Sequence, residues 1–487
     1  MTKNSQGRNS VKVNIIMNFI LTISSFIFPL ITFPYVSRIL LPVGTGKVAF
    51  ATSVVSYFTM FGMLGIPTYG IRATAKVRHD KNKLSKLVQE IMTINGIAML
   101  ISLFFYILAI LFIPKLVANR ILFIINISVL LLNFIGCDWL YKGLEQYQFI
   151  TIRSVIMKFV AVILMFVFVN STSDFPAYGA ITILASLGSY FFNFINLRNI
   201  VELKFDKELN LKQHFRPILT FFVMTVATTI YTSLDSVMLG FMKGDEAVGY
   251  YNAAINIKNI LVSLVTSVGA VLLPRLSVFI KEKRETEFRD LTSKALYFVV
   301  FISIPLSVYF FIYAKQGIYF LSGSAFDNSV IPMQIVMPTL LLIGLSNLFG
   351  IQILVPMDRE LVVVHSVSLG AVTNLVLNSI LIPIYGVSGA ALGTLVAEFL
   401  VTIYQAFYLR DFLSKIIYPV DYMKILLSAI IAGGVSSLIS LSFLISINNN
   451  FFELVISFIV FGLMYFITLI VFREKTFLSI IESFKRN

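Results

Sequence analysis

Four charged residues interrupt long apolar runs of the chain, where a charge is costly and therefore informative. Lys258 and Glu398 lie near the middle of their runs. Asp235 lies two turns from the end of its run, and Lys158 lies a turn or two inside another. A full charge near the centre of a membrane costs roughly 2.5–3.5 kcal/mol, so such residues usually bind an ion or a substrate, or pair with each other. We expect Lys158 instead to extend its long side chain to the cytoplasmic surface.

Polar residues also recur at helical spacing along three of the apolar runs. A stripe of amides and hydroxyls does not face lipid cheaply, so it faces other helices or a hydrated cavity. Hydrogen bonding between helices would explain any single residue, whereas three stripes of four or more residues favour a cavity. The stripes are Asn14, Asn18, Thr22, Ser25, Pro29 and Thr32 in the first run, Thr225, Thr229, Thr232 and Ser236 in the seventh, and Asn252, Asn256, Asn259, Ser263 and Thr266 in the eighth.

The composition indicates that these runs face lipid. Hydrophobic residues make up 58% of the 487 residues and charged residues only 13%, whereas a soluble domain carries about a quarter charged residues. So few charges cannot cover a water-soluble surface, and we predict an all-α polytopic membrane protein. The single cysteine, Cys137, excludes an intrachain disulfide and argues against a thiol metal site. We expect no metal and no cofactor.

Fourteen apolar runs are long enough to cross a membrane, which takes roughly 20 residues. We therefore predict about 14 transmembrane helices. They lie near 13–36, 48–70, 87–113, 119–138, 153–170, 177–197, 217–242, 249–274, 295–314, 331–356, 361–383, 386–409, 425–446 and 451–472.

The distribution of basic residues predicts the orientation. With an even number of spans, both termini lie on one side, and the loops on that side hold 30 Lys and Arg residues against 6 in the opposite loops. By the positive-inside rule both termini are cytoplasmic. The net charge of +14 is thus mostly a topology signal, and we expect no nucleic-acid partner. The external loops are short and hold no cluster of carboxylates, which disfavours an enzyme.

A weak internal repeat relates helices that are six apart. Asn133-Phe-Ile-Gly136 in the fourth run matches Asn347-Leu-Phe-Gly350 in the tenth, and Tyr178-Gly179 matches Tyr385-Gly386. Chance similarity between apolar sequences is the alternative explanation. A repeat of this kind predicts two parallel six-helix lobes with a substrate site between them. The predicted domains are 13–200, 215–410 and a C-terminal helix pair at 424–472.

One motif resembles a nucleotide-binding loop but fails on spacing. Gly44-Thr-Gly46-Lys47 lacks the required upstream glycine, since position 41 is Leu41, and Val48 replaces the Ser or Thr after the lysine. We expect no ATP site, so active transport would have to use a gradient.

Six short motifs follow one another along the first twelve predicted helices. They are Pro34-Tyr-Val-Ser-Arg38, Gly65-Ile-Pro-Thr-Tyr-Gly-Ile-Arg72, Asp138-Trp-Leu-Tyr-Lys-Gly143-Leu-Glu145, Leu234-Asp235-Ser-Val-Met-Leu-Gly240, Val248-Gly-Tyr-Tyr-Asn252 and Tyr385-Gly-Val-Ser-Gly-Ala-Ala. In this order they resemble the polysaccharide transporter (PST) family of the multidrug/oligosaccharidyl-lipid/polysaccharide (MOP) flippase superfamily, which includes the Wzx proteins. One departure is Leu41-Pro42, where the family usually has Gly-Pro.

The resemblance implies a MOP-type fold and a flippase for undecaprenyl-diphosphate-linked oligosaccharide repeat units in the cell membrane of a bacterium. It implies lipid-linked oligosaccharide as substrate, membrane lipid as surroundings, and the polymerase and other polysaccharide-assembly proteins as partners. The alternatives are a multidrug/cation antiporter of the related branch and a membrane glycan polymerase. The candidate site residues are Arg38, Lys258, Arg72 and Arg275 for the diphosphate, Asn14, Asn18, Asn252, Asn256 and Asn259 for sugars, and Asp235 and Glu398 for ion or proton coupling or as partners of buried bases.

Overall fold

The computed structural model describes residues 11–202, 209–416, 421–444 and 450–478, and this part of the chain contains helices and no β-strand. The chain forms two compact units, Met1–Phe241 and Met242–Asn487. The predicted division into 13–200, 215–410 and 424–472 stays a prediction. The helices of the first unit are α1 (Val11–Met63), α2 (Ile66–Val77), α3 (Lys81–Phe112), α4 (Pro114–Val117), α5 (Arg120–Gly136), α6 (Asp138–Gly143), α7 (Tyr147–Phe168), η1 (Thr172–Asp174), α8 (Phe175–Leu187), α9 (Ser189–Ile200) and α10 (Lys212–Lys243), the last of which ends two residues into the second unit.

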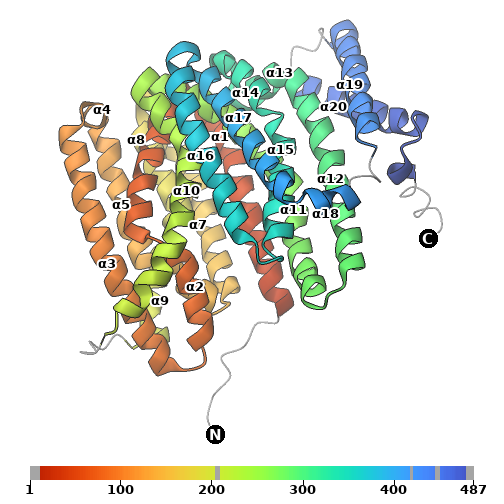
Figure 1. Ribbon diagram of the computed structural model, residues 1–487. Helices are drawn as coiled ribbons and strands as arrows, with labels where there is room; N and C mark the ends of the chain where they lie inside the picture. Colours follow the sequence, from red (N-terminus) through yellow and green to blue (C-terminus); the bar gives the residue numbers. More distant parts are fainter. Residues whose placement is uncertain (1–10, 203–208, 417–420, 445–449, 479–487) are drawn as a thin grey trace. The chain divides into compact units, whose positions relative to one another are not determined.

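The second unit is built in the same way from long helices and short connections (Figure 1). It contains two π-helical segments, η3 and η4. Its elements are α11 (Asp245–Lys281), α12 (Glu285–Ile312), α13 (Ala314–Ser322), η2 (Ser324–Ser329), α14 (Val330–Val336), α15 (Thr339–Asn347), η3 (Leu348–Leu354), α16 (Glu360–Tyr385), α17 (Val387–Tyr408), α18 (Arg410–Ile416), α19 (Tyr422–Ile439), η4 (Ser440–Leu444) and α20 (Asn450–Val471).

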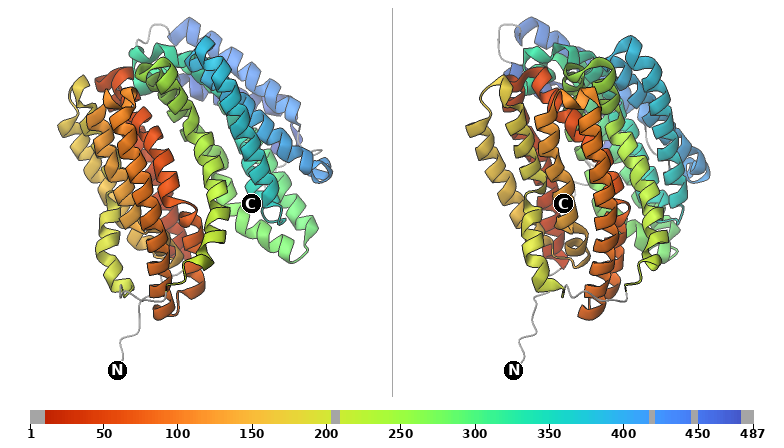
Figure 2. Two further views of the ribbon diagram at one scale, coloured as in Figure 1. Left: turned by 60° about the vertical axis from the view of Figure 1, so that its left-hand side comes forward. Right: turned by 90° about the vertical axis from the view of Figure 1, so that its left-hand side faces the viewer.

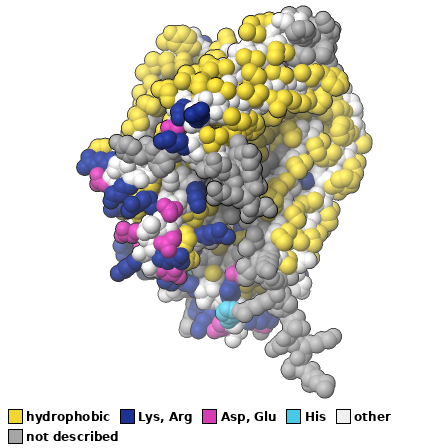
Figure 3. Space-filling model, turned by 90° about the vertical axis from the view of Figure 1, so that its right-hand side faces the viewer, with side chains coloured by type: hydrophobic (Ala, Val, Ile, Leu, Met, Phe, Trp, Pro, Cys, Tyr) yellow, Lys and Arg dark blue, Asp and Glu magenta, His cyan; other side chains and the backbone are white. Residues whose placement is uncertain are grey.

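The helices have the length and apolarity of membrane spans. The described residues contain 11 such helices, or up to 12 if the pair Ser324–Val336 and Thr339–Leu354, bent by 49°, is one span. The predicted number of 14 is compatible with this, because α1 contains two predicted spans and α11 covers a further one, 249–274. On the face drawn in Figure 3, hydrophobic side chains cover a broad band, and charged side chains gather toward one end.

Helix α1 joins its two spans through a kink at Leu41. The backbone of Leu41 has φ 58° and ψ −179°, while the flanking residues remain helical. The cause lies in the next residue, because a proline disfavours the helical conformation of the residue before it and has no N–H to donate. Leu41-Pro42 therefore ends the first span and lets the second begin.

Helix α1 is also the element against which the first unit assembles. It packs on α3, α5, α7 and α8, and these helices run alongside one another in both further views (Figure 2). Two bonds fix α7 to it: the Thr151 hydroxyl donates to the Met17 carbonyl at 2.9 Å, and the Tyr35 hydroxyl donates to the Val169 carbonyl at 3.0 Å. These bonds place the polar residues of α1 and α7 opposite each other.

A buried polar network fixes the start of α10 to α2 and α3. The Glu90 carboxylate of α3 lies 2.8 Å from His214 Nε2 and accepts from the Asn210 backbone N–H at 2.8 Å and the Gln213 amide at 3.0 Å. His214 Nδ1 lies 2.6 Å from the hydroxyl of Tyr69 in α2. Since Glu90 and His214 are 2% and 3% exposed, these bonds replace the water that both groups would otherwise require.

The C-terminal helices α19 and α20 pack on each other and on α12. The Tyr309 hydroxyl of α12 lies 2.7 Å from the Leu454 carbonyl and 2.9 Å from the Ser457 hydroxyl. Beyond α20, the buried Glu474 carboxylate accepts from the Tyr297 hydroxyl at 3.1 Å. The pair is thus joined to the rest of the second unit by hydrogen bonds as well as by apolar packing.

Candidate functional site

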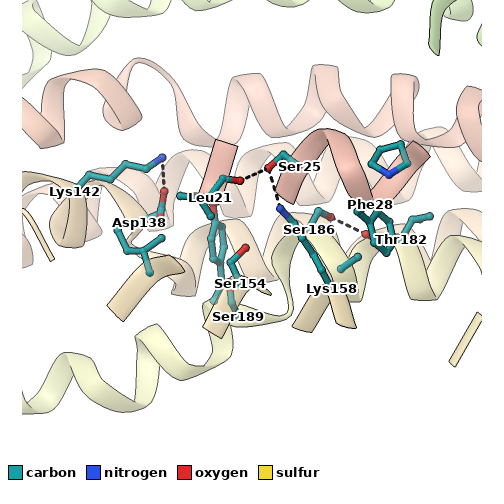
Figure 4. Close-up of a pocket in the computed structure, with 14 residues that line it drawn as sticks. Leu21, Ser25, Phe28, Asp138, Lys142, Ser154, Lys158, Thr182, Ser186 and Ser189 are labelled. Carbon is teal, nitrogen blue, oxygen red and sulfur yellow. Dashed lines mark hydrogen bonds and ion pairs between the residues drawn. The ribbon is translucent and has the colours of Figure 1, made fainter. Parts of the chain in front are cut away.

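A pocket of about 350 Å³ lies inside the first unit (Figure 4). Three helices reach it with residues at helical spacing, so each presents one face, and the short helix α6 closes one end. This volume is within the range of small-ligand sites. The lining residues are Leu21, Ser25, Phe28 and Pro29 of α1, Asp138 and Lys142 of α6, Ile150, Ser154 and Lys158 of α7, Thr182, Ala185 and Ser186 of α8, and Ser189 and Tyr190 of α9.

Lys158 projects into this pocket and does not extend to the cytoplasmic surface as expected. Its ammonium group donates to the hydroxyls of Ser24 at 2.9 Å and Ser25 at 2.8 Å. Both hydroxyls in turn donate to the Leu21 carbonyl, at 2.7 and 3.0 Å. An ammonium group has three N–H donors, and the described residues supply acceptors for two of them. The third can donate to a ligand in the pocket.

A second basic group, Lys142, lines the end of the pocket formed by α6. Its ammonium group lies 2.6 Å from Asp138 Oδ2, while Asp138 Oδ1 is buried without a hydrogen-bond partner among the described residues. The ring of Tyr190 completes this end. A Cβ atom on Gly136 would lie 2.3 Å from that ring, so a glycine at the end of α5 is what lets α9 approach.

The neighbouring Arg153 is a buried cation that lies against aromatic rings. It is 7% exposed, and its three guanidinium nitrogens have no hydrogen-bond partner among the described residues. Its guanidinium group lies over the rings of Phe149 at 4.3 Å and Tyr141 at 5.1 Å. Cation–π contacts of this kind hold the group in place but leave its N–H donors unused. Together the two lysines, the arginine and Asp138 carry three positive charges and one negative charge.

The structure places the eleven predicted site residues elsewhere, since none of them is among the described residues that line this pocket. In the first unit, Arg38 and Asn18 are exposed on α1, Asn14 is half-buried there, Arg72 is exposed on α2 over the ring of Phe221 at 5.1 Å, and Asp235 is buried on α10. In the second unit, Lys258, Asn252 and Asn256 are half-buried on α11, Asn259 and Arg275 are exposed on it, and Glu398 is buried on α17.

The polar stripe predicted in the first apolar run does reach the pocket in part. Ser25 and Pro29, which belong to the predicted polar stripe of the first run, line it, while Asn18 and Thr22 of the same stripe are exposed. Lys158, Asp138 and Lys142 are missing from the predicted site residues. A signal for Lys158 was present in the spacing Ile150, Ser154, Lys158, which places a serine and a lysine on one helix face.

A second pocket, in the second unit, has the opposite character. It lies between α12, α15, η3 and α19, and the described residues that line it include no charged residue. Such a pocket suits an apolar chain and not a charged group. Its lining residues are Leu296, Val300, Ile304, Leu341, Leu345, Phe349, Tyr422, Met423 and Leu426.

Membrane-spanning helices that enclose a basic, hydroxyl-lined pocket are the architecture of a polytopic transporter. Solved structures of such transporters resemble this chain. The inward closed conformation of the lipid II flippase MurJ matches with a TM-score of 0.72 at 18% identity, covering 95% of this chain and 99% of the other. The inward-facing conformation of a MATE family multidrug resistance transporter of the MOP superfamily matches with a TM-score of 0.59 at 12% identity, covering 82% and 98%. The chain thus has the MOP-type transporter fold.

The sequence comparisons add the family. A model described as polysaccharide biosynthesis protein matches residues 11–280, and the chain belongs to this family. This confirms the resemblance seen in the motifs. The MatE family model also matches, over residues 221–380. A relative in Escherichia coli (strain K12) named “Putative O-antigen transporter” is 27% identical over 407 residues, which cover 82% of this chain and 97% of the relative. One of the same name in Shigella dysenteriae is 23% identical over 405 residues, covering 81% and 99%.

Proposed function

We propose that the protein is a flippase that moves undecaprenyl-diphosphate-linked oligosaccharide repeat units from the inner to the outer leaflet of a bacterial cell membrane. It works by alternating access, without ATP and without chemical change to its substrate. Both termini lie in the cytoplasm, and a polymerase and other polysaccharide-assembly proteins receive the product. The observation that carries this proposal is the pocket in which Lys158 presents an N–H donor among serine hydroxyls, inside helices that face lipid.

The chemistry of the pocket supports an anionic, sugar-bearing substrate. A diphosphate carries about two negative charges and accepts charge-assisted hydrogen bonds, for which Lys158 and Lys142 are suitable donors. Hydroxyl groups such as those of Ser154, Ser186 and Ser189 can bond to sugar hydroxyls. Moving two negative charges outward across 100 mV, inside negative, is favourable by roughly 4.6 kcal/mol, so the membrane potential can drive the step.

The apolar pocket of the second unit supports a lipid-linked substrate. An isoprenoid chain offers only apolar surface, and an apolar lining accepts it without leaving a buried polar group unpaired.

The eleven residues predicted from the sequence lie outside the first-unit pocket, and their roles are part of this proposal. Arg38, Arg72, Lys258 and Arg275 are proposed to contact the diphosphate, and Asn14, Asn18, Asn252, Asn256 and Asn259 to contact the sugars. Asp235 and Glu398 are buried, which suits either ion coupling or pairing with a base.

A reconstituted flipping assay tests the proposal. Purified protein in proteoliposomes should accelerate the movement of a fluorescent undecaprenyl-diphosphate oligosaccharide between leaflets, and Lys158→Met should slow it. Lys83→Met, which removes a lysine that is exposed on the same unit, is the matched control and should retain the wild-type rate. A rate equal to that of protein-free liposomes would refute the proposal.

A multidrug/cation antiporter is the second candidate, favoured by the MatE match over residues 221–380. The charge of the first-unit pocket opposes it, since Lys142, Lys158 and the adjacent Arg153 outnumber Asp138. Uptake of a fluorescent cationic drug into the same proteoliposomes, driven by a proton or sodium gradient, would favour the antiporter if lipid flipping were absent.

A further inference from the structure

The ion pair between Asp138 and Lys142 is the feature of the first-unit pocket that a simple anion site would not need. Asp138 is the one acidic residue among the described residues that line the pocket. It neutralises a lysine that could otherwise bind an anionic ligand, at a distance of 2.6 Å. The two side chains keep 16% and 37% of their surface exposed, so the pair is accessible from the pocket and can be opened.

The second carboxylate oxygen of Asp138 is also informative. Oδ1 is buried without a hydrogen-bond partner among the described residues, and so are three nitrogens of Arg153, which lies over the ring of Tyr141, three residues after Asp138. A carboxylate with one oxygen in an ion pair and the other without a partner among the described residues can form a second bond. It would turn toward Arg153 when Lys142 takes another partner, and the guanidinium group would then gain an acceptor.

We propose that Asp138 is a built-in counter-ion that occupies the place of a phosphate group in the empty pocket and exchanges with it on binding. This inference rests on the proposed function and adds how the head group is bound and released. On entry of the diphosphate, Lys142 passes from Asp138 to the ligand, and Lys158 supplies its third N–H. On release, the Asp138 carboxylate returns to Lys142 and displaces the anion.

The exchange affects the rate of substrate release, because a transporter that binds its substrate too tightly releases it slowly. Two lysines and an arginine without a competing carboxylate would hold a diphosphate strongly. With Asp138 present, the cations are neutralised as the ligand leaves. Removing the charge of Asp138 should therefore raise the affinity for the diphosphate and lower its rate of release.

Binding and flipping by full-length protein, measured side by side, test this. Asp138→Asn keeps the size of the side chain and should bind undecaprenyl diphosphate about tenfold more tightly, because it removes a like charge beside the ligand, while maximal flipping falls several-fold. Asp138→Glu keeps the carboxylate, so its affinity and maximal flipping rate should stay closer to those of the wild type than the values of Asp138→Asn. Lys142→Gln should weaken binding. The control is Glu145→Gln, which breaks an equally short ion pair, 2.6 Å to Arg78, outside the pocket and should change neither value.

The outcomes separate the two proposals. If the wild type flips the lipid but Asp138→Asn binds it with unchanged or lower affinity, the counter-ion exchange is refuted and the flippase stands. If the Asn variant does not fold, Lys142→Gln decides, since undiminished binding would refute the exchange. Inorganic pyrophosphate should compete with the lipid. If pyrophosphate binds while the wild type neither binds nor flips the lipid, the flippase proposal fails, and the exchange fails with it.

Discussion

We predict that glycine stabilises the protein more than alanine at position 41. The reason is that Leu41, at the kink of α1, has a backbone conformation that suits glycine. With φ 58° and ψ −179°, Leu41 lies in a region that residues with a Cβ atom rarely adopt, at a cost on the order of 1–3 kcal/mol. We compare two variants, Leu41→Gly and Leu41→Ala. Both remove the leucine side chain, which is 39% exposed, so the lost packing is similar and the pair differs in the Cβ atom alone.

The expected difference follows from two opposing terms. Glycine relieves the backbone strain of about 1–3 kcal/mol, and its greater freedom in the unfolded chain costs about 0.5–1 kcal/mol relative to alanine. The free energy of unfolding should therefore be higher for the glycine variant than for the alanine variant, by up to about 2.5 kcal/mol. In an ordinary helical position the order is reversed, with alanine better by about 0.8–1.0 kcal/mol.

The assay is the free energy of unfolding of purified protein in mixed micelles, titrated with a denaturing detergent. Val43, which is 45% exposed and has helical backbone angles, supplies the matched pair Val43→Gly and Val43→Ala, for which alanine should be the more stable. The reasoning is refuted if alanine is at least as stable as glycine at position 41 while the pair at position 43 behaves normally.

Three other perturbations have defined outcomes. Glu90→Ala leaves His214 and two further donors without their acceptor and should lower the free energy of unfolding by about 3–5 kcal/mol, measured in the same micelles; a loss below 1 kcal/mol would contradict the role of this network. Lys258→Ala should impair translocation in proteoliposomes at normal protein levels, and unchanged transport would remove Lys258 from the site. Hydrogen bonds from Lys83 and a neighbouring backbone N–H lower the pKa of Asp80. The stability that Asp80 adds is therefore present above its ordinary pKa of 3.8 and is lost as the pH falls through the lower pKa of the folded state. Asp80→Asn should reduce the loss of thermal stability between pH 5 and pH 3, and an unchanged loss would contradict this.

Much of the fold could be predicted because lipid imposes a simple rule on sequence. Each span has to be apolar for about 20 residues, so runs such as 87–113 and 386–409 closely match α3 and α17. Connections between spans follow no such rule. The sequence places a break between 36 and 48, yet α1 is helical on both sides of Leu41, because the loss of one proline N–H bends a helix without requiring a loop.

The site was harder to predict, because its decisive contacts join residues far apart in the chain. Lys158 is long enough to reach the cytoplasmic surface or to turn inward, and only the packing of α7 against α1, which brings Ser24 and Ser25 within 2.9 Å, decides between them. In the sequence, Arg153 is one of the 30 basic residues predicted to lie on the cytoplasmic side. Its position over Tyr141 of α6 depends on how the chain turns before α7, which composition and charge counts do not reveal.

The internal repeat stays a prediction, and the structure adds one observation to it. The matched glycines both lie at close helix contacts: Gly136 meets Tyr190 of α9, and Gly350 meets Gln405 of α17. A repeat of this kind would preserve where helices meet, which depends on small residues, and would leave the lining side chains to vary. The first unit carries lysines and serines in its pocket. The second has an apolar pocket completed by α19, a helix outside the repeat. The substrate proposed above has a charged head and an apolar tail, and the linings of the two pockets differ in the same way.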